Sequence, residues 1–332
     1  MRSISKRQFM ILFIFITVSL MLLLDINLST SSQRNSILEN NTELLVLINL
    51  TPTPHPLPEQ RYNTSSLVTT LWRQLFGKKN GITDPSVIIH NSYKMLENDF
   101  FELYIEDEKL IIDPQWWQQE SKKVFEYVSQ KLDVSLDEKV VVVIVKPIKE
   151  NCSPRGTTLH ELEPIILLYA DNTTSKEQIL AVLAHELGHV FINKHYKNLS
   201  DVALIEGMAT WMSGDYWEEW KGIDFDSSVK ELVSQKAYFS LFQNFEMEKA
   251  FDEKNPACIA NRDTLLTEFA SFLDYLINEY GLDKLFLLFE MRQPETVNNQ
   301  RIVYQPNYRE VYGLELNQLE YNWLNHILGT NK

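Results

Sequence analysis

Two histidines and a glutamate lie at a spacing that suits a metal ion, within an otherwise apolar stretch of the chain. The stretch reads LAVLAHELGHVFINKHYKN over residues 180–198 and contains His185, Glu186 and His189. Because an α-helix turns about once every 3.6 residues, His185 and His189 point to the same side of a helix and can reach one ion. Glu186 lies beside them and can accept a proton from a metal-bound water. The spacing therefore predicts metal-assisted hydrolysis.

A pair of hydrated histidines on a helix surface is the alternative to a metal site. The residues around the motif are apolar on every side of the predicted helix, so that helix is expected to be buried nearly all round. Burying the carboxylate of Glu186 is costly unless a partner of opposite charge lies nearby. A divalent cation held by the two histidines supplies such a partner, which favours the metal site.

A catalytic zinc requires a third protein ligand and an open position for water. Glu206 is the favoured candidate, because it lies in a second apolar segment, ALIEGMATWMSGDYW, with no lysine or arginine close by in the sequence. His195 is the alternative, ten residues after His185 as in the pattern HExxHxxGxxH. The glycine of that pattern permits a sharp turn, which the β-branched Ile192 at this position resists. We therefore predict one Zn²⁺ per chain, held by His185, His189 and Glu206.

The motifs lie in a chain whose strands are predicted before its helices. The predicted strands form a hairpin that turns at residues 107–109, a buried strand over 139–147 and a further strand over 164–170. The predicted helices cover residues 114–132, 176–194, 203–213, 229–245, 263–280, 282–291 and 316–328. Strands followed by helices are typical of an α+β fold.

The two motif segments together resemble the gluzincin metallopeptidases, and most closely the peptidase MA-like domains. LAHELGHV is followed by LIEGMATWMSG, which is similar to the second motif of that family. Two later segments, FASFLDYLINEYGLDKL and VYGLELNQLEYNWLNHI, are similar to its closing helices. The resemblance covers about residues 85–328 and implies a zincin-like α+β fold with a small N-terminal sheet, an active-site helix and a helical C-terminal half.

The resemblance also implies roles for individual residues. His185, His189 and Glu206 would bind the zinc, and Glu186 would be the general base. The implied function is hydrolysis of a peptide or protein substrate through a zinc-activated water. The strand predicted over residues 164–170 would be the edge of the sheet, where an extended peptide pairs beside the zinc.

The sequence departs from the family at one place that affects catalysis. Related enzymes often carry a tyrosine near the start of the helix over residues 264–280, where it donates a hydrogen bond to the developing oxyanion. Leu265 and Leu266 occupy that place, and Tyr238 and Tyr275 are the candidate substitutes. Losing one such donor typically lowers the rate about 100- to 1000-fold. The alternative function is therefore a catalytically weak or inactive zincin-like domain that serves as a binding or scaffold module.

The first 28 residues are predicted to be a cytoplasmic tail and a transmembrane signal anchor. An uncharged run over residues 9–24 follows three basic residues, Arg2, Lys6 and Arg7. This charge asymmetry predicts that the N-terminus stays in the cytoplasm and the rest of the chain is translocated. A cleaved signal peptide is the alternative. We expect a single-pass membrane protein whose peptidase domain is extracytoplasmic.

The remaining 304 residues of the 332-residue chain divide into a linker and one large domain. Residues 29–82 are rich in proline, threonine and asparagine and include TPTPHPLP, which favours an extended stalk. Residues 83–330 form the predicted peptidase domain. The net charge of −14 opposes binding to nucleic acid. Cys152 and Cys258 are the only cysteines, and their spacing leaves open whether they form a disulfide.

Overall fold

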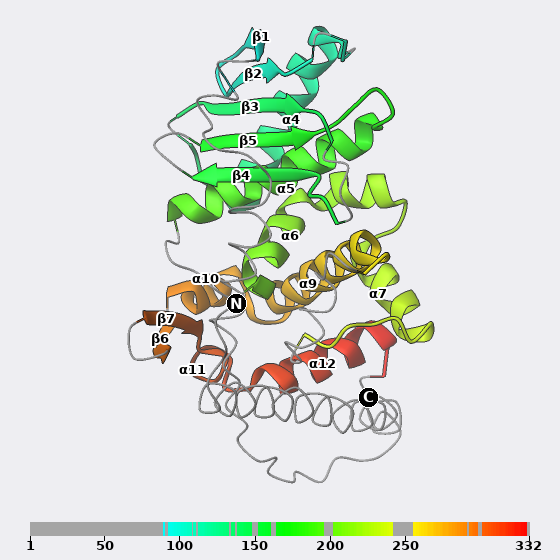
Figure 1. The fold of residues 1–332 in the computed structure, drawn as a ribbon. Helices are drawn as coiled ribbons and strands as arrows, with labels where there is room; N and C mark the ends of the chain where they lie inside the picture. Colours follow the sequence, from blue (N-terminus) through cyan, green and yellow to red (C-terminus); the bar gives the residue numbers. More distant parts are fainter. Residues whose placement is uncertain are drawn as a thin grey trace, which may run out of the picture. The chain divides into compact units, whose positions relative to one another are not determined.

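The computed structural model describes Ile89 and residues 92–330, except 108, 111, 133, 137, 148–151, 161–163, 196–201, 242–254, 291 and 298–300 (Figure 1). All of these residues belong to one compact unit, Arg61–Lys332. The predicted anchor (1–28) and stalk (29–82) lie outside the described residues. Within the described part of the chain, no helix combines the length and the apolar character needed to cross a membrane.

A mixed sheet of five strands has the order β1-β2-β3-β5-β4. The strands are β1 (Tyr93–Glu97), β2 (Phe101–Ile105), β3 (Val140–Val145), β4 (Gly156–His160) and β5 (Pro164–Tyr169). β3 runs parallel to β2 and β5, whereas β1 and β4 pair antiparallel with their neighbours. All residues of β3 are buried, as expected for a β-branched central strand covered on both faces.

Two predictions about the sheet are wrong. No strand follows β2 in the described residues of 107–112; β2 instead pairs with the preceding β1, and the turn is made at Asn98. The Asn98 side chain accepts hydrogen bonds from the backbone N–H groups of Phe100 and Phe101, which stabilises this turn. The predicted edge strand over 164–170 is interior, because β4 lies outside it. β4 is short and polar (GTTLH), so it lacks the apolar run that marks a strand in a sequence.

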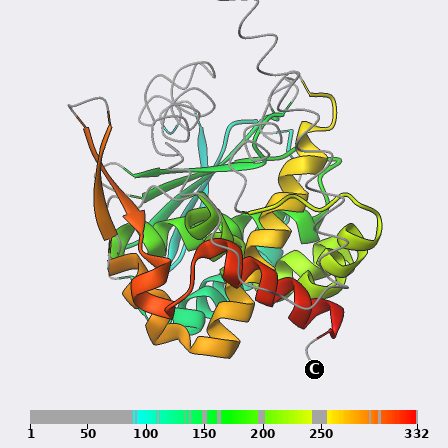
Figure 2. The same ribbon diagram turned by 90° about the horizontal axis from the view of Figure 1, so that it is seen from below.

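The described part of the chain also contains eight helices and a small hairpin. One helix lies between β2 and β3 in the sequence, and the other elements follow β5. The helices are α4 (Pro114–Leu132), α5 (Lys176–His195), α6 (Val202–Lys221), α7 (Phe225–Ser234), α9 (Cys258–Tyr280), α10 (Leu282–Glu290), α11 (Tyr308–Tyr312) and α12 (Leu316–Leu328). The hairpin, which the sequence did not predict, consists of β6 (Arg292–Val297) and β7 (Arg301–Pro306). Figures 1 and 2 show α4 and α5 along one face of the sheet, with α6, α9 and α12 progressively farther from it. The arrangement is α+β.

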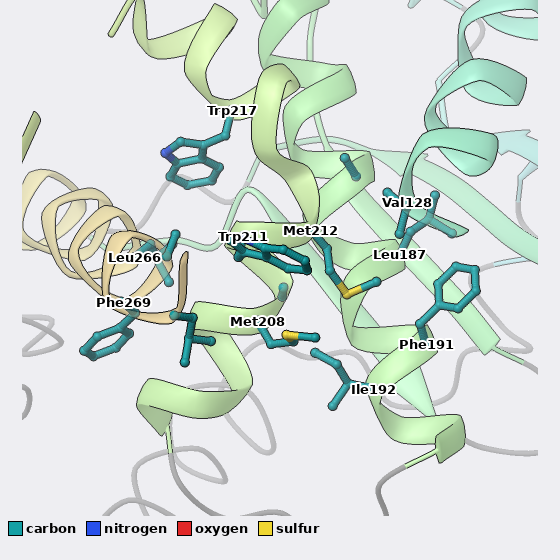
Figure 3. Close-up of a cluster of buried hydrophobic side chains, with 14 of the residues drawn as sticks. Val128, Leu187, Phe191, Ile192, Met208, Trp211, Met212, Trp217, Leu266 and Phe269 are labelled. Atoms are coloured by element: carbon teal, nitrogen blue, oxygen red, sulfur yellow. The ribbon is translucent and has the colours of Figure 1, made fainter. Parts of the chain in front are cut away.

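The core continues from the sheet into the helices through alternate residues of β3. Val142 and Ile144 belong to the large apolar cluster formed with the helices, whereas Val141 and Val143 pack with β5 on the other face. α5 is buried along most of its length, from residue 179 to 192. Figure 3 shows apolar side chains filling the space between α5, α6 and α9. The predicted motif helix is therefore a central element of the core, as its apolar flanks indicated.

α6 bends at Gly214, where φ is 38° and ψ is −117°. A Cβ at this position would overlap the hydroxyl of Tyr127 and lie 2.5 Å from Nζ of Lys131. The ammonium of Lys131 donates to the carbonyl of Trp211 at 3.1 Å, and the backbone N–H of Asp215 donates to the Tyr127 hydroxyl at 2.9 Å. α4 thus supplies hydrogen-bond partners to backbone groups beside the bend.

Candidate metal centre

α5 and α6 bring His185, His189 and Glu206 together. The Nε2 atoms of the two histidines are 3.1 Å apart, and they lie 3.3 and 3.7 Å from Oε2 of Glu206. Donor atoms that bind one tetrahedral zinc at its usual distances are about 3.3 Å from one another. All three side chains are buried, and each offers one ligand atom. Their geometry and chemistry therefore fit a single zinc ion.

Two glycines permit the close approach of the helices that carry these side chains. Gly188 of α5 faces α6, and a Cβ there would lie only 2.8 Å from the Cα of Ala209. Gly207 of α6 faces α9, and a Cβ there would lie 3.0 Å from the Cβ of Phe269. Figure 3 shows α5 and α6 side by side, with α9 against α6. Because Gly188 directly precedes His189 and Ala209 follows Glu206 by three residues, this close approach lies beside the three side chains.

Contacts from α6 orient the imidazole of His185. Its Nδ1 lies 3.1 Å from the hydroxyl of Thr210, one turn after Glu206, so that Nε2 faces the carboxylate. The ring of Trp217 lies against the imidazole with centroids 5.9 Å apart. Trp217 is held in turn by a hydrogen bond from its Nε1 to the hydroxyl of Thr267 on α9, at 3.3 Å. Outer contacts of this kind fix the orientation of metal-binding histidines.

The buried charges of the triad compensate one another. Burial opposes ionisation of Glu206, but the charges of His189 and His185 and the hydrogen bond with His185 outweigh burial and lower its pKa to about 2. Burial also opposes protonation of His185, yet its hydrogen bond with Glu206 raises its pKa overall. The site therefore holds an ionised carboxylate that requires a cation, either protons on the histidines or a metal ion.

Glu186 lies beside the triad but is not part of it. Its carboxylate accepts a hydrogen bond of 2.7 Å from the hydroxyl of Thr158 in β4. Burial raises its pKa to about 7, although the charge of His185 and the bond from Thr158 act in the opposite direction. A carboxyl group with a pKa near neutrality is suited to accept and return a proton.

Comparison with known proteins places the chain in a family. A model of peptidase family M48 matches residues 118–296, which is more than half of the 332 residues. The chain belongs to peptidase family M48. This is a zincin-type, gluzincin family of zinc metallopeptidases, so the predicted gluzincin membership is confirmed. No curated protein matches the chain.

The alternative third ligand, His195, is not part of the triad. α5 continues through Ile192 to His195, so the sharp turn that this alternative requires does not occur. The side chain of His195 is exposed, whereas the cluster of possible metal ligands in the described residues consists of His185, His189 and Glu206. A β-branched residue is tolerated inside a helix, whereas it resists the sharp turn that a glycine permits, which explains the outcome.

The two tyrosines considered as oxyanion donors are engaged elsewhere. The hydroxyl of Tyr238 donates to the carboxylate of Glu320 on α12. The ring of Tyr275 packs against Tyr280 and His326, with centroids 6.3 and 5.4 Å apart. Among the described residues, no hydrogen bond or ring contact joins either tyrosine to the triad, and their role as oxyanion donors stays a prediction. Sequence position alone does not show which face of a helix or turn meets the site.

Sequence reasoning missed three residues around the site. Thr158 belongs to the unpredicted strand β4, and Thr210 follows Glu206 by one helical turn, a spacing that could have revealed it. The third is Arg262 in the first turns of α9, whose positive charge helps to lower the pKa of Glu206 and opposes a small part of the rise in the pKa of Glu186. Nη1 of Arg262 donates to the carbonyl of Cys152 at 3.0 Å. No local pattern relates α9 to the metal motif.

Proposed function

We propose that this M48 chain is a membrane-anchored, extracytoplasmic zinc metallopeptidase that uses Glu186 as general base. The observation that supports it is the buried group of His185, His189 and Glu206, with the carboxylate of Glu186 next to it but outside it. These three residues would hold one zinc. The zinc, when bound, supplies a Lewis acid that polarises the scissile carbonyl and makes its bound water acidic.

The side chains around the zinc site then handle the proton and the substrate. Glu186 accepts the proton of the attacking water and delivers it to the leaving amine. β4 is the terminal strand of the five-stranded sheet, so its outer edge is suited to pair with an extended peptide. This role, assigned to residues 164–170 from the sequence, therefore moves to residues 156–160. A peptide on this edge lies beside Glu186, because Thr158 of the same strand contacts that carboxylate.

The extracytoplasmic location is supported by a disulfide. Cys152 and Cys258 are bonded, which joins parts of the chain 106 residues apart. Such bonds persist in oxidising compartments and are rare in the cytosol. Together with the basic and apolar N-terminal pattern, the disulfide favours translocation of the domain. Protease added to intact cells should degrade the domain, whereas recovery of the full-length protein in the soluble cytosolic fraction would contradict the anchor.

Zinc content tests the ligands. Purified protein should carry about one zinc per chain, and alanine at His185, His189 or Glu206 should each remove it because a three-ligand site does not survive the loss of one ligand. His195→Ala is the matched control and should leave the metal in place. The measurement is elemental analysis of the purified variants. A zinc-free Glu206→Ala protein would support the assignment, and an emptied His195→Ala site would reverse it.

Glu186→Gln tests peptidase activity against the alternative of a binding or scaffold module. Glutamine keeps the size of the side chain but removes the basic oxygen, so zinc content and thermal stability should stay nearly unchanged. Cleavage of a broad peptide library should fall by at least about 100-fold, as is typical when general-base assistance is lost. If zinc-loaded wild type cleaves the library no better than Glu186→Gln, the binding module is the better description.

A further inference from the structure

We infer that the edge strand β4 holds the carboxylate of Glu186 in its reactive position, with Thr158 as the positioning residue and Gly156 providing the necessary space. This inference rests on the proposed function, since it gives Glu186 the role of general base. It concerns how that base is held, which neither the metal motif nor the family membership specifies.

The hydroxyl of Thr158 lies within hydrogen-bond distance of two oxygens of Glu186. It is 2.7 Å from Oε2 of the carboxylate and 3.0 Å from the backbone carbonyl oxygen. A hydroxyl has one hydrogen to donate, and a bond to an ionised carboxylate is stronger than one to a neutral carbonyl. The shorter distance to Oε2 agrees with this preference. Thr158 therefore fixes one of the two carboxylate oxygens.

Gly156 faces the other carboxylate oxygen. Residues two apart in a strand point to the same side, so Gly156 and Thr158 both face α5. A Cβ on Gly156 would lie 2.6 Å from Oε1 of Glu186, 2.7 Å from its Cγ and 2.7 Å from Cγ1 of Val182. These distances are too short for carbon contacts, so any side chain at 156 would displace the carboxylate. The strand thus positions Glu186 in two ways: the hydroxyl of Thr158 binds one carboxylate oxygen, and Gly156, which has no side chain, leaves room for the other.

The chain immediately before β4 is fastened to α9. Cys152 is bonded to Cys258, and its carbonyl accepts a hydrogen bond of 3.0 Å from Arg262. Arg155 forms a two-fold ion pair with Asp263, with distances of 2.5 and 2.9 Å. β4 also pairs with β5 along its length. The position of Thr158 is therefore determined by the disulfide and polar contacts just before β4 and by the hydrogen bonds of β4 with β5.

This arrangement gives the edge strand two functions in the proposed reaction. Its outer edge pairs with the peptide, and its residues facing α5 hold the base that acts on the water beside that peptide. The distance between substrate and base is then set by a single strand. Because small misplacements of a catalytic group cost about 100-fold in rate, loss of the Thr158 contact should be visible in kcat.

The first test compares three threonine variants of the full-length, zinc-loaded protein. Thr158→Val keeps the shape but removes the hydroxyl, and it should lower kcat about 10- to 100-fold while KM changes by less than about twofold. Thr158→Ser restores the hydroxyl and should recover most of the loss. Thr330→Val is the matched control, because Thr330 lies after α12, outside β4 and the metal centre, and its hydroxyl donates to the side-chain oxygen of Asn325 at 2.8 Å. It should behave like wild type.

A binding measurement keeps the inference testable even if no library peptide is cleaved. Acetohydroxamate chelates zinc and shares its proton with a neighbouring carboxylate, so its affinity reports the position of Glu186 without turnover. Calorimetry should show about tenfold weaker binding to Thr158→Val than to Thr330→Val, at equal zinc content. Equal acetohydroxamate affinities would overturn the inference. Library cleavage equal to that of Glu186→Gln would instead overturn the peptidase proposal and leave the positional result standing.

Gly156→Ala provides a second variant in case Thr158→Val fails to fold. Its methyl group would press on the opposite carboxylate oxygen, so it should weaken acetohydroxamate binding in the same direction while the hydroxyl of Thr158 remains. Circular dichroism establishes that each variant is folded. If folded Gly156→Ala binds acetohydroxamate as tightly as wild type, β4 does not determine the position of the base.

Discussion

Gly188 determines how closely α5 approaches α6, so Gly188→Ala should separate the proposed zinc ligands. The added Cβ would lie 2.8 Å from the Cα of Ala209, whereas carbon atoms in contact are normally about 3.5–4.0 Å apart. The helices must therefore move apart by about 0.7–1.2 Å at this point. Zinc–ligand distances vary by only about 0.2 Å, so Glu206, one turn from Ala209, would be carried out of bonding distance.

Two opposing effects decide the stability of the metal-free Gly188→Ala protein. Overpacking a tight contact costs about 1–3 kcal/mol, and here the obstructing atoms are backbone atoms that cannot rotate away. Alanine in a helix gains about 0.5–1 kcal/mol over glycine. The free energy of unfolding should therefore fall by about 0–2.5 kcal/mol. Zinc affinity should fall by at least about 100-fold, because a ligand and not merely its outer contact is displaced.

Zinc affinity is measured by competition with a chromogenic chelator, and stability by urea unfolding of the metal-free protein. Gly207→Ala is the matched control, since its methyl group would meet Phe269 at 3.0 Å and Leu273 at 3.1 Å on α9. It therefore crowds the contact between α6 and α9 and not the contact between α5 and α6. It should destabilise the fold while keeping zinc affinity within about tenfold of wild type. A Gly188→Ala protein that is more stable than wild type and binds zinc equally well would refute this reasoning.

Two further predictions concern stability. Replacing Cys152 and Cys258 by serine opens a loop of 106 residues and should lower the free energy of unfolding by about 4.8 kcal/mol, measured by urea unfolding; a loss below about 1 kcal/mol would contradict it. Burial raises the pKa of Asp226 above 3.8, although the hydrogen bond from Ser271 acts to lower it. The protonated carboxyl therefore stabilises the fold at low pH, and this contribution is lost as pH rises through the folded pKa. Unfolding at a series of pH values should therefore show the advantage of Asp226→Asn growing with pH; an advantage that shrinks would be contrary evidence.

The sequence alone was sufficient for the features that depend on local geometry. His185 and His189 face the same way because residues four apart in any α-helix do so, whatever the rest of the chain does. Helix α4 was predicted at its observed bounds, Pro114–Leu132, because its apolar residues recur with helical spacing after a proline start. Glu206 was selected by chemistry, as an acid without a nearby basic residue in an apolar segment, and the structure places it beside both histidines.

Tertiary structure alone decided which residues from distant segments surround that motif. Thr158 lies 28 positions before Glu186 in sequence, yet its hydroxyl is 2.7 Å from the carboxylate. β4 escaped prediction because an edge strand needs no continuous apolar run, and its order in the sheet follows from pairing with β5. The disulfide likewise depends on a spatial approach of Cys152 and Cys258 that their sequence spacing does not determine. Periodicity encodes the shape of one element, whereas the contacts between elements are set by packing of the whole core.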